Sequence, residues 1–312
     1  MLRFQGASLI DGSIICNRPF GYATGLFEFL IHKLLVEAGE LLDNDKGQRT
    51  KDKGQRTKDK AGLMHQVLIL SDLHLSSSTL AFNQLFIKQL PLWAEEYDAL
   101  YLLGDIFDAW LGDDIIAKKV QPILTSLRSF SRKRPLYFMH GNRDFLIGES
   151  FLEITGAQPL QDPSIVEIYG QNYLLTHGDI LCTSDTAYQA FRKKTRDENW
   201  KKNILKHSTF YRKILAKIIR QVSKIKGKIA YQKKISDATE EGIVQLKTRF
   251  SHCPEADIIH GHTHLPKMHT DTFIFEGKPY PFKRYVLPDW RIDVCGGIII
   301  NEQQEVKYLY FS

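Results

Sequence analysis

Residues 66–75 read QVLILSDLHL, a short run of aliphatic residues followed by Asp72 and His74. An apolar run of this length that ends in a polar turn is typical of an interior strand of an α/β sheet. A carboxylate and an imidazole two residues apart are both possible ligands of a divalent cation. The stretch therefore predicts a buried strand with metal-binding chemistry at its carboxyl end.

Four later segments repeat this design. ALYLLG (99–104), PLYFMHG (135–141), YLLTHG (173–178) and DIIHG (257–261) each end in a polar turn. Residues 79–96 and 117–130 are helical stretches between the early runs, which indicates an α/β fold. The tail, 284–311, has no room for helices, and we expect it to complete the sheet as antiparallel strands.

The turns that follow these runs carry seven oxygen and nitrogen donors and no thiolate. They are Asp72, His74, Asp105, Asn142, His177, His262 and His264. Because the carboxyl ends of strands in α/β sheets converge on one crevice, we expect these side chains to meet. Such donors suit a pair of divalent ions such as Mn²⁺, iron or zinc, and a two-metal centre typically catalyses displacement at phosphorus.

Composition limits the other possibilities. The chain has 312 residues, 43% of them hydrophobic, enough for one large domain with an insertion or a tail. The four cysteines, Cys16, Cys182, Cys253 and Cys295, are far apart, which argues against disulfides and a zinc–thiolate site. No apolar run is long enough to span a membrane and no signal-peptide pattern is present, so we expect a protein of the cytosol or facing it.

The first 63 residues differ from the rest. Residues 45–58 are an exact tandem repeat of DKGQRTK without an apolar residue, which we interpret as disordered. Residues 24–42 have the pattern of an amphipathic helix and could anchor the chain to a membrane surface. The alternative, which we favour, is that residues 1–63 are an upstream extension, that Met64 is the true start, and that 64–312 form the domain.

Positive charge is concentrated in one segment. Residues 192–234 contain 16 lysines and arginines against two acids, while the whole chain has a net charge of +6. Apolar residues recur there at three- and four-residue spacing, which predicts helices. They are Trp200, Ile204, Tyr211, Leu215, Ile218, Val222 and Ile225.

The five strand-end motifs, in this order, resemble the calcineurin-like metallophosphoesterase family over nearly all of residues 65–312. GDIFDAWLGDD (104–114), HGNRDFLIG (140–148) and THGDILCTSDTAYQAFR (176–192) are similar to the UDP-2,3-diacylglucosamine diphosphatases of lipid A biosynthesis. The resemblance implies an α/β sandwich of mixed sheets flanked by helices, with a helical lid insertion at about 185–250. It also implies Mn²⁺-dependent hydrolysis of UDP-2,3-diacylglucosamine to UMP and 2,3-diacylglucosamine 1-phosphate. The enzyme would be peripheral, at the cytoplasmic face of the bacterial inner membrane.

The resemblance also assigns roles to residues. One of two Mn²⁺ ions would be held by Asp72, His74, Asp105 and His264, and the second by Asn142, His177 and His262 together with Asp105 as the bridge. Substrate contacts would be Asn142, Arg143, Asp185, Ser223 and His262, and catalytic roles would fall to Asp105 and Arg143. The family's lysine contact is out of register here, since position 230 is Ala230, so Lys228 and Lys233 are the candidates. His140 and His260 match no ligand position, and we expect them to be the last residues of strands or to support ligands.

Arg143 is informative because many relatives have histidine at this position. Histidine can protonate an alkoxide leaving group, whereas arginine cannot act as a general acid. A phosphate leaving group needs little protonation, so Arg143 favours cleavage of a diphosphate, with its fork binding phosphate oxygens. The alternative is that Arg143 is only a surface ion-pair partner.

The basic segment has two interpretations that do not exclude each other. It is a lid whose apolar side encloses acyl chains while its basic side meets an anionic membrane, or a helical hairpin packed on the domain with a solvated charged face. A nuclease of the same superfamily would use the basic surface with Trp200, Phe210 and Tyr211 to stack bases. A protein phosphatase and a non-catalytic scaffold fit less well. We expect a lipid-linked nucleotide-sugar substrate, no nucleic acid and no obligate protein partner.

Overall fold

The computed structural model describes residues 7–10, 13–16, 65–217, 237–291 and 294–311. The chain divides into two units, Met1–Leu63 and Met64–Ser312. The described part of the first unit is an antiparallel pair, β1 (Ala7–Ile10) and β2 (Ser13–Cys16). The repeat at 45–58 and the amphipathic pattern at 24–42 lie outside the described residues, so the interpretations placed on them stay predictions.

The second unit contains a six-stranded sheet in the order β13-β12-β3-β4-β5-β6. Four neighbouring strands are parallel: β3 (Gln66–Leu70), β4 (Ala99–Leu103), β5 (Leu136–Met139) and β6 (Gln158–Leu160). The chain returns at its end to add β12 (Cys295–Asn301) and β13 (Val306–Phe311), each antiparallel to its inner neighbour.

A five-stranded sheet has the order β10-β11-β9-β8-β7. Its three central strands are parallel: β8 (Gln171–Thr176), β9 (Asp257–His260) and β11 (Lys278–Val286). The outer strands, β7 (Ser164–Ile168) and β10 (Met268–Phe275), are antiparallel to their neighbours.

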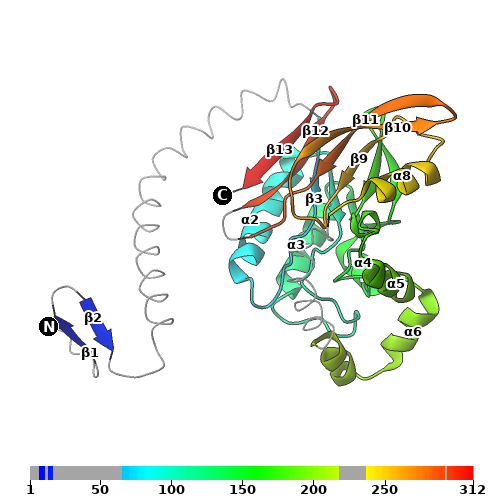
Figure 1. Cartoon of the computed structure of the whole chain (residues 1–312). Helices are drawn as coiled ribbons and strands as arrows, with labels where there is room; N and C mark the ends of the chain where they lie inside the picture. The colour runs from blue at the N-terminus through cyan, green and yellow to red at the C-terminus, as the bar shows by residue number, and fades with distance from the viewer. Residues whose placement is uncertain (1–6, 11–12, 17–64, 218–236, 292–293, 312) are drawn as a thin grey trace, which may run out of the picture. The chain divides into compact units, whose positions relative to one another are not determined.

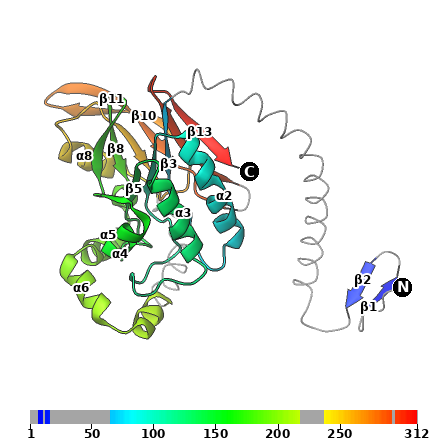
Figure 2. The same ribbon diagram turned by 180° about the vertical axis from the view of Figure 1, so that it is seen from behind.

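The two sheets pack face to face, because their strands are apolar on both faces. On β3, Leu68 and Leu70 pack with α2 (Leu80–Glu96) and α3 (Gln121–Ser131), whereas the alternate residues Val67 and Ile69 belong to the core shared with the other sheet. A third cluster joins Ile258 of β9 to α8 (Glu240–Arg249). The layers are therefore helix, sheet, sheet and helix (Figures 1 and 2).

The expected α/β sandwich is confirmed, and the five apolar runs are β3, β4, β5, β8 and β9. The expectation that the whole tail completes one sheet as antiparallel strands was wrong in part. Residues 284–286 belong to β11, which runs parallel to β9 in the five-stranded sheet, and only β12 and β13 complete the other. An apolar sequence pattern indicates that a strand is buried, but it does not indicate to which sheet the strand belongs.

The 3₁₀ turn η2 (Asp179–Leu181) follows β8 and leads into the expected insertion at about 185–250. The insertion begins with α5 (Thr186–Thr195), α6 (Glu198–Lys206) and helical residues 209–217, whereas 218–236 are not described. α5 and α6 begin at aspartates that cap them, since Asp185 accepts from the Tyr188 N–H at 2.9 Å and Asp197 from the Trp200 N–H at 2.8 Å. Among the helices in the described ranges, none combines the length and the apolar character needed to cross a membrane.

Candidate metal centre

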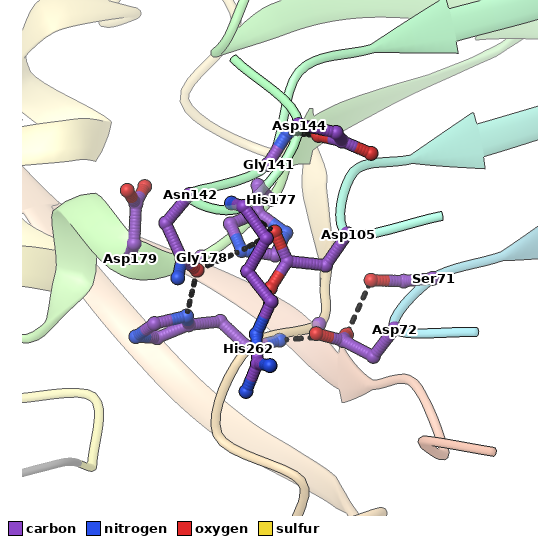
Figure 3. A network of polar contacts seen from close by, with 12 residues as sticks. Ser71, Asp72, Asp105, Gly141, Asn142, Asp144, His177, Gly178, Asp179 and His262 are labelled. Carbon is purple, nitrogen blue, oxygen red and sulfur yellow. Dashed lines mark hydrogen bonds and ion pairs between the residues drawn. The ribbon is translucent and has the colours of Figure 1, made fainter. Parts of the chain in front are cut away.

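The loops at the carboxyl ends of the strands run beside one another, as the motif pattern predicts. The amide of Asp72 donates to Gly104 O at 3.1 Å and that of His74 to Asp105 O at 3.0 Å, which joins the loops after β3 and β4. The amide of His262, from the other sheet, donates to Asp72 Oδ2 at 2.9 Å. Side chains from both sheets therefore meet at one point (Figure 3).

The backbone at this point is unusual. Eight non-glycine residues in the described part have positive φ, and five of them are predicted metal ligands. These five are Asp72, His74, Asp105, His262 and His264, with φ of 57°, 50°, 53°, 68° and 56°. Such a conformation is unfavourable for residues with a Cβ atom and persists where the surrounding structure fixes it, as at functional sites.

Two glycines allow the loops to approach closely. A Cβ atom on Gly141 would lie 2.2 Å from Asp105 Oδ1, and one on Gly261 would lie 2.2 Å from Asp72 Oδ2. Any side chain at either position would displace a predicted ligand. The glycines in GNRD and GHTH are therefore required by the packing of the site.

One group of donors consists of Asp72, His74 and His264, whose ligand atoms all lie within 4.8 Å of one another. His264 Nε2 is 3.2 Å from Asp72 Oδ1, and its Nδ1 is 3.4 Å from Asp289 Oδ2. Both ring nitrogens of His74 are buried and lack a hydrogen-bond partner. A buried imidazole without a partner, beside a carboxylate, fits a bound cation.

A second set surrounds the amide oxygen of Asn142. His177 Nε2 lies 2.9 Å from Asn142 Oδ1 and His262 Nδ1 lies 3.0 Å from it, and Figure 3 shows the three side chains pointing toward one another. A separation of about 3 Å is that expected between neighbouring ligands of one cation. The Nδ1 of His177 is 3.0 Å from Leu103 O, so an N–H there leaves the Nε2 lone pair directed at the site.

The electrostatics of the site also indicate a cation. Burial raises the pKa of Asp105 to about 7. For Asp72, burial acts in the same direction, but the hydrogen bond from His264 and the nearby imidazoles outweigh it and hold its pKa well below the usual value. Burial alone would lower the pKa of His177, but Asp105 and Asp72 outweigh it and raise that pKa to about 9. The buried carboxylates therefore attract positive charge, which divalent ions would supply.

Two imidazoles are held neutral and so keep lone pairs for coordination. Burial lowers the pKa of His74 to about 3 and that of His262 to about 4.

Asp72, Asp105 and His177 form a second compact group of possible ligands. Within the described residues, the carboxylate common to this group and to the group of Asp72, His74 and His264 is therefore Asp72. The assignment of Asp105 as the bridge stays a prediction.

Arg143 lies beside Asp105, one of the predicted ligands. Its side chain is 39% exposed, with Nη1 2.7 Å from Asp108 Oδ1 and Nε 3.4 Å from Asp105 Oδ2. Its amide also donates to Asp105 Oδ1 at 2.8 Å. Arg143 is therefore ion-paired, as in the alternative interpretation of this residue. One of its two partners is Asp105, a predicted metal ligand.

The remaining predicted site residues lie elsewhere. Asp185 is half-buried at the start of α5, where it caps the helix, while Ser223, Lys228 and Lys233 fall within the residues that are not described. His140 follows β5, with Nε2 2.8 Å from Ile147 O. His260 is the last residue of β9, buried, with Nε2 3.2 Å from Arg284 Nη1.

Sequence reasoning missed a layer of buried aspartates behind the predicted ligands. Asp144 accepts from the Gly141 N–H at 2.7 Å and from the Ile106 N–H at 2.8 Å, which ties the loops of Asn142 and Asp105 together. Asp289 lies beside His264. Asp144 is the fourth residue of the GNRD turn, so its place in that motif was the available signal.

The basic segment separates into two chemical groups. Its arginines at 192, 196 and 212 are ion-paired to the domain through Asp162, Asp179 and Asp114. Lys202, Lys206, Lys213 and Lys217 are exposed. Among the apolar residues, Trp200, Ile204 and Leu215 pack against the core, as in the hairpin interpretation, whereas Phe210 is 72% and Tyr211 47% exposed.

The chain is similar to known phosphoesterases. The model of the calcineurin-like phosphoesterase family matches residues 65–266. Three curated relatives named UDP-2,3-diacylglucosamine hydrolase are each 37% identical to this chain. The protein of Chromobacterium violaceum aligns over 233 residues, 75% of this chain and 94% of its own. That of Xanthomonas axonopodis pv. citri aligns over 227 residues (72% and 90%), and that of Coxiella burnetii over 246 (78% and 96%). The chain therefore belongs to the calcineurin-like phosphoesterase family, among the relatives named UDP-2,3-diacylglucosamine hydrolases.

Proposed function

We propose that this protein hydrolyses the diphosphate of UDP-2,3-diacylglucosamine, releasing UMP and 2,3-diacylglucosamine 1-phosphate in lipid A biosynthesis. The observation that carries the proposal is the position of Arg143, whose Nε lies 3.4 Å from Oδ2 of Asp105, one of the buried donors. The names of the curated relatives, UDP-2,3-diacylglucosamine hydrolases, support the same substrate. We further propose that two Mn²⁺ ions bind, one at Asp72, His74, Asp105 and His264 and the other at Asp105, Asn142, His177 and His262.

When bound, these ions would supply the positive charge that stabilises phosphoryl oxygens and would activate water for attack on the α-phosphorus. Arg143 would bind phosphate oxygens with its planar fork, in exchange for its contact with Asp108. Arginine donates no proton at neutral pH, so the departing group must leave as a phosphate, which carries its charge without protonation. Asn142 and His262, at the edge of the same cluster, are proposed to contact the substrate, together with Asp185 and with Ser223, Lys228 or Lys233.

The direct test is turnover of UDP-2,3-diacylglucosamine by the purified full chain. We expect UMP to appear when Mn²⁺ is added to metal-free protein and to stop appearing when the metal is chelated. Failure to release UMP, combined with metal-dependent cleavage of single-stranded DNA, would overturn the proposal in favour of a nuclease. Failure of both reactions in protein that binds no metal would favour a non-catalytic scaffold.

We also propose that the insertion associates with the anionic cytoplasmic face of the bacterial inner membrane. Residues 199–217 contain six lysines and arginines and no acid, and Leu205, Phe210, Tyr211 and Ile214 are exposed there. Exposed apolar residues flanked by lysines suit a surface of anionic lipids. Trp200 is less available for stacking bases, because it packs beside Phe145, with ring centroids 6.1 Å apart.

A further inference from the structure

A buried cluster of ion pairs lies behind the candidate metal centre. Arg192 of α5 places Nη2 2.8 Å from Asp162 Oδ2, in the loop between β6 and β7, and Nε 3.0 Å from Asp179 Oδ1, just after β8. Arg196 adds a contact to Asp179 Oδ2 at 3.6 Å. The side chains of Asp179, Asp162 and Arg192 are only 0%, 8% and 15% exposed. One guanidinium thus joins two buried carboxylates from separate segments.

Two members of this cluster, Asp162 and Arg196, contact a proposed ligand or its neighbour in the chain. Asp162 Oδ1 accepts from the His177 N–H at 3.1 Å and from the Thr176 hydroxyl at 2.6 Å. Arg196 Nη2 donates to Gly141 O, the residue before Asn142, at 2.8 Å. The cluster therefore fixes the backbone that presents two of the donors.

A third member of the cluster, Asp179, is linked to the proposed ligand His262 through Tyr188. The Tyr188 hydroxyl donates to Asp179 Oδ2 at 2.6 Å, and its ring stacks on that of His262 with centroids 6.0 Å apart and planes at 27°. Asn142, His177 and His262 are the three donors proposed for the second ion besides Asp105. The described contacts of Arg192, Arg196, Asp162 and Asp179 include none to His74 or His264, which belong to the first set.

We propose that Arg192, a residue of the insertion, is a positioning residue for the second cation site alone. The proposal rests on the proposed two-ion function and assigns the insertion a part in it. Arginine suits the task because its planar fork spans two carboxylates, and lysine would reach only one. Residues that orient metal ligands typically change metal affinity by about 10- to 100-fold when they are replaced.

The test is a titration of metal-free full-length protein with Co²⁺, followed by visible absorption and calorimetry, which need no turnover. Wild type should bind two ions. In Arg192→Met the affinity of one ion should fall by about 10- to 100-fold while the other is unchanged, and Arg192→Lys should give a smaller loss. Asp162→Asn, which keeps an oxygen for the His177 N–H but removes the charge facing Arg192, should weaken the same ion.

The matched control is Arg212→Met. Arg212 is also a buried arginine of the insertion, 3% exposed, with Nη1 2.8 Å from Asp114 Oδ1. Its described hydrogen-bond acceptors, in Leu111, Asp114 and His207, are not among the proposed ligands. Both ions should bind to this variant with wild-type affinity.

Three results would overturn the inference. Wild-type affinities for both ions in folded Arg192→Met or Asp162→Asn would show that the cluster positions neither site. Equal weakening of both ions would show that Arg192 has only a general structural role. Binding of a single ion by the wild type would instead refute the two-ion centre, and the inference with it.

Discussion

The metal centre and the insertion are both rich in polar residues, but many of those at the metal centre are buried, whereas many of those on the insertion are exposed. At the metal centre Asp72 and His177 are completely buried. Asp72 has a positive φ, and the His177 N–H donates to a buried aspartate, Asp162. On the insertion Phe210 is 72% exposed, and Lys202, Lys206, Lys213 and Lys217 are exposed as well. Arg192 and Arg212 are the exceptions, because they attach the insertion to the domain.

This difference predicts how each region responds to substitution. A buried donor has no alternative partner, so its loss is not compensated by water or by a neighbouring side chain. An exposed lysine contributes one of many similar long-range charges, so its loss is small and is screened by salt. Effects should therefore be abrupt at the metal centre and graded on the insertion.

The largest effect is expected for Asp105→Ala. If its carboxylate bridges the two ions, both should be lost and UMP release should fall by at least about 100-fold, more than for a residue that only orients a ligand. Metal analysis together with turnover measures both quantities. His140→Ala is the control and should keep two ions per chain. Loss of both ions from Asp72→Ala, with one retained in Asp105→Ala, would move the bridge to Asp72, the carboxylate that the two donor groups share.

Arg143→Lys should lower turnover by about 10- to 100-fold, because a hydrogen bond to a charged group contributes about 1.5–3 kcal/mol and lysine keeps the charge without the fork. Steady-state rates with UDP-2,3-diacylglucosamine measure this change. Arg134→Lys, at an arginine 3.5 Å from Asp98 on the domain surface, should leave the rate unchanged. Equal rates for Arg143→Lys and wild type would reduce Arg143 to an ion-pair partner of Asp108.

On the insertion, replacement of Lys213 and Lys217 by glutamine should weaken binding to anionic vesicles by about 30-fold at low salt, since each basic residue near such a surface contributes about 1 kcal/mol. Cosedimentation with phosphatidylglycerol vesicles at rising salt measures the change. The same substitutions at Lys278 and Lys283, exposed on β11, are the control. The membrane proposal fails if both pairs behave alike.

The smallest expected effect is the number of protons released when a cation binds at the second donor set. His177 has a pKa of about 9 without metal, so it is protonated at pH 8 and must lose that proton to coordinate through Nε2. Cation affinity at the second site should therefore rise with pH up to about 9, with close to one proton released per ion at pH 8. Calorimetry in buffers of different ionisation enthalpy measures the release. His262, with a pKa of about 4, contributes none at this pH, so no proton release at pH 8 would contradict the role of His177.

Local sequence patterns were enough to predict the strands and the types of metal-binding residue, and this prediction needed little information about the rest of the fold. The central residues of QVLIL and DIIH are aliphatic because both faces of each strand are covered, and the polar residues that follow the strands must lie at a sheet edge. The helical spacing of Trp200, Ile204 and Leu215 correctly indicated helices. It did not distinguish a stripe that packs on the core from one that encloses a ligand, because both are apolar on one face.

Local sequence patterns identify which short segments are buried strands and which chemistry follows each of them, since both properties depend on neighbouring residues. The donors come from two sheets, and Asp144 and Asp289 support them. Arg192, Arg196 and Arg212 are anchors, whereas Lys202, Lys206, Lys213 and Lys217 are surface charges. These outcomes depend on contacts such as His177 Nδ1 with Leu103 O and Arg192 with Asp162. The partners in such contacts lie far apart in the chain, and burial and charge pairing across that distance have no local sequence signal.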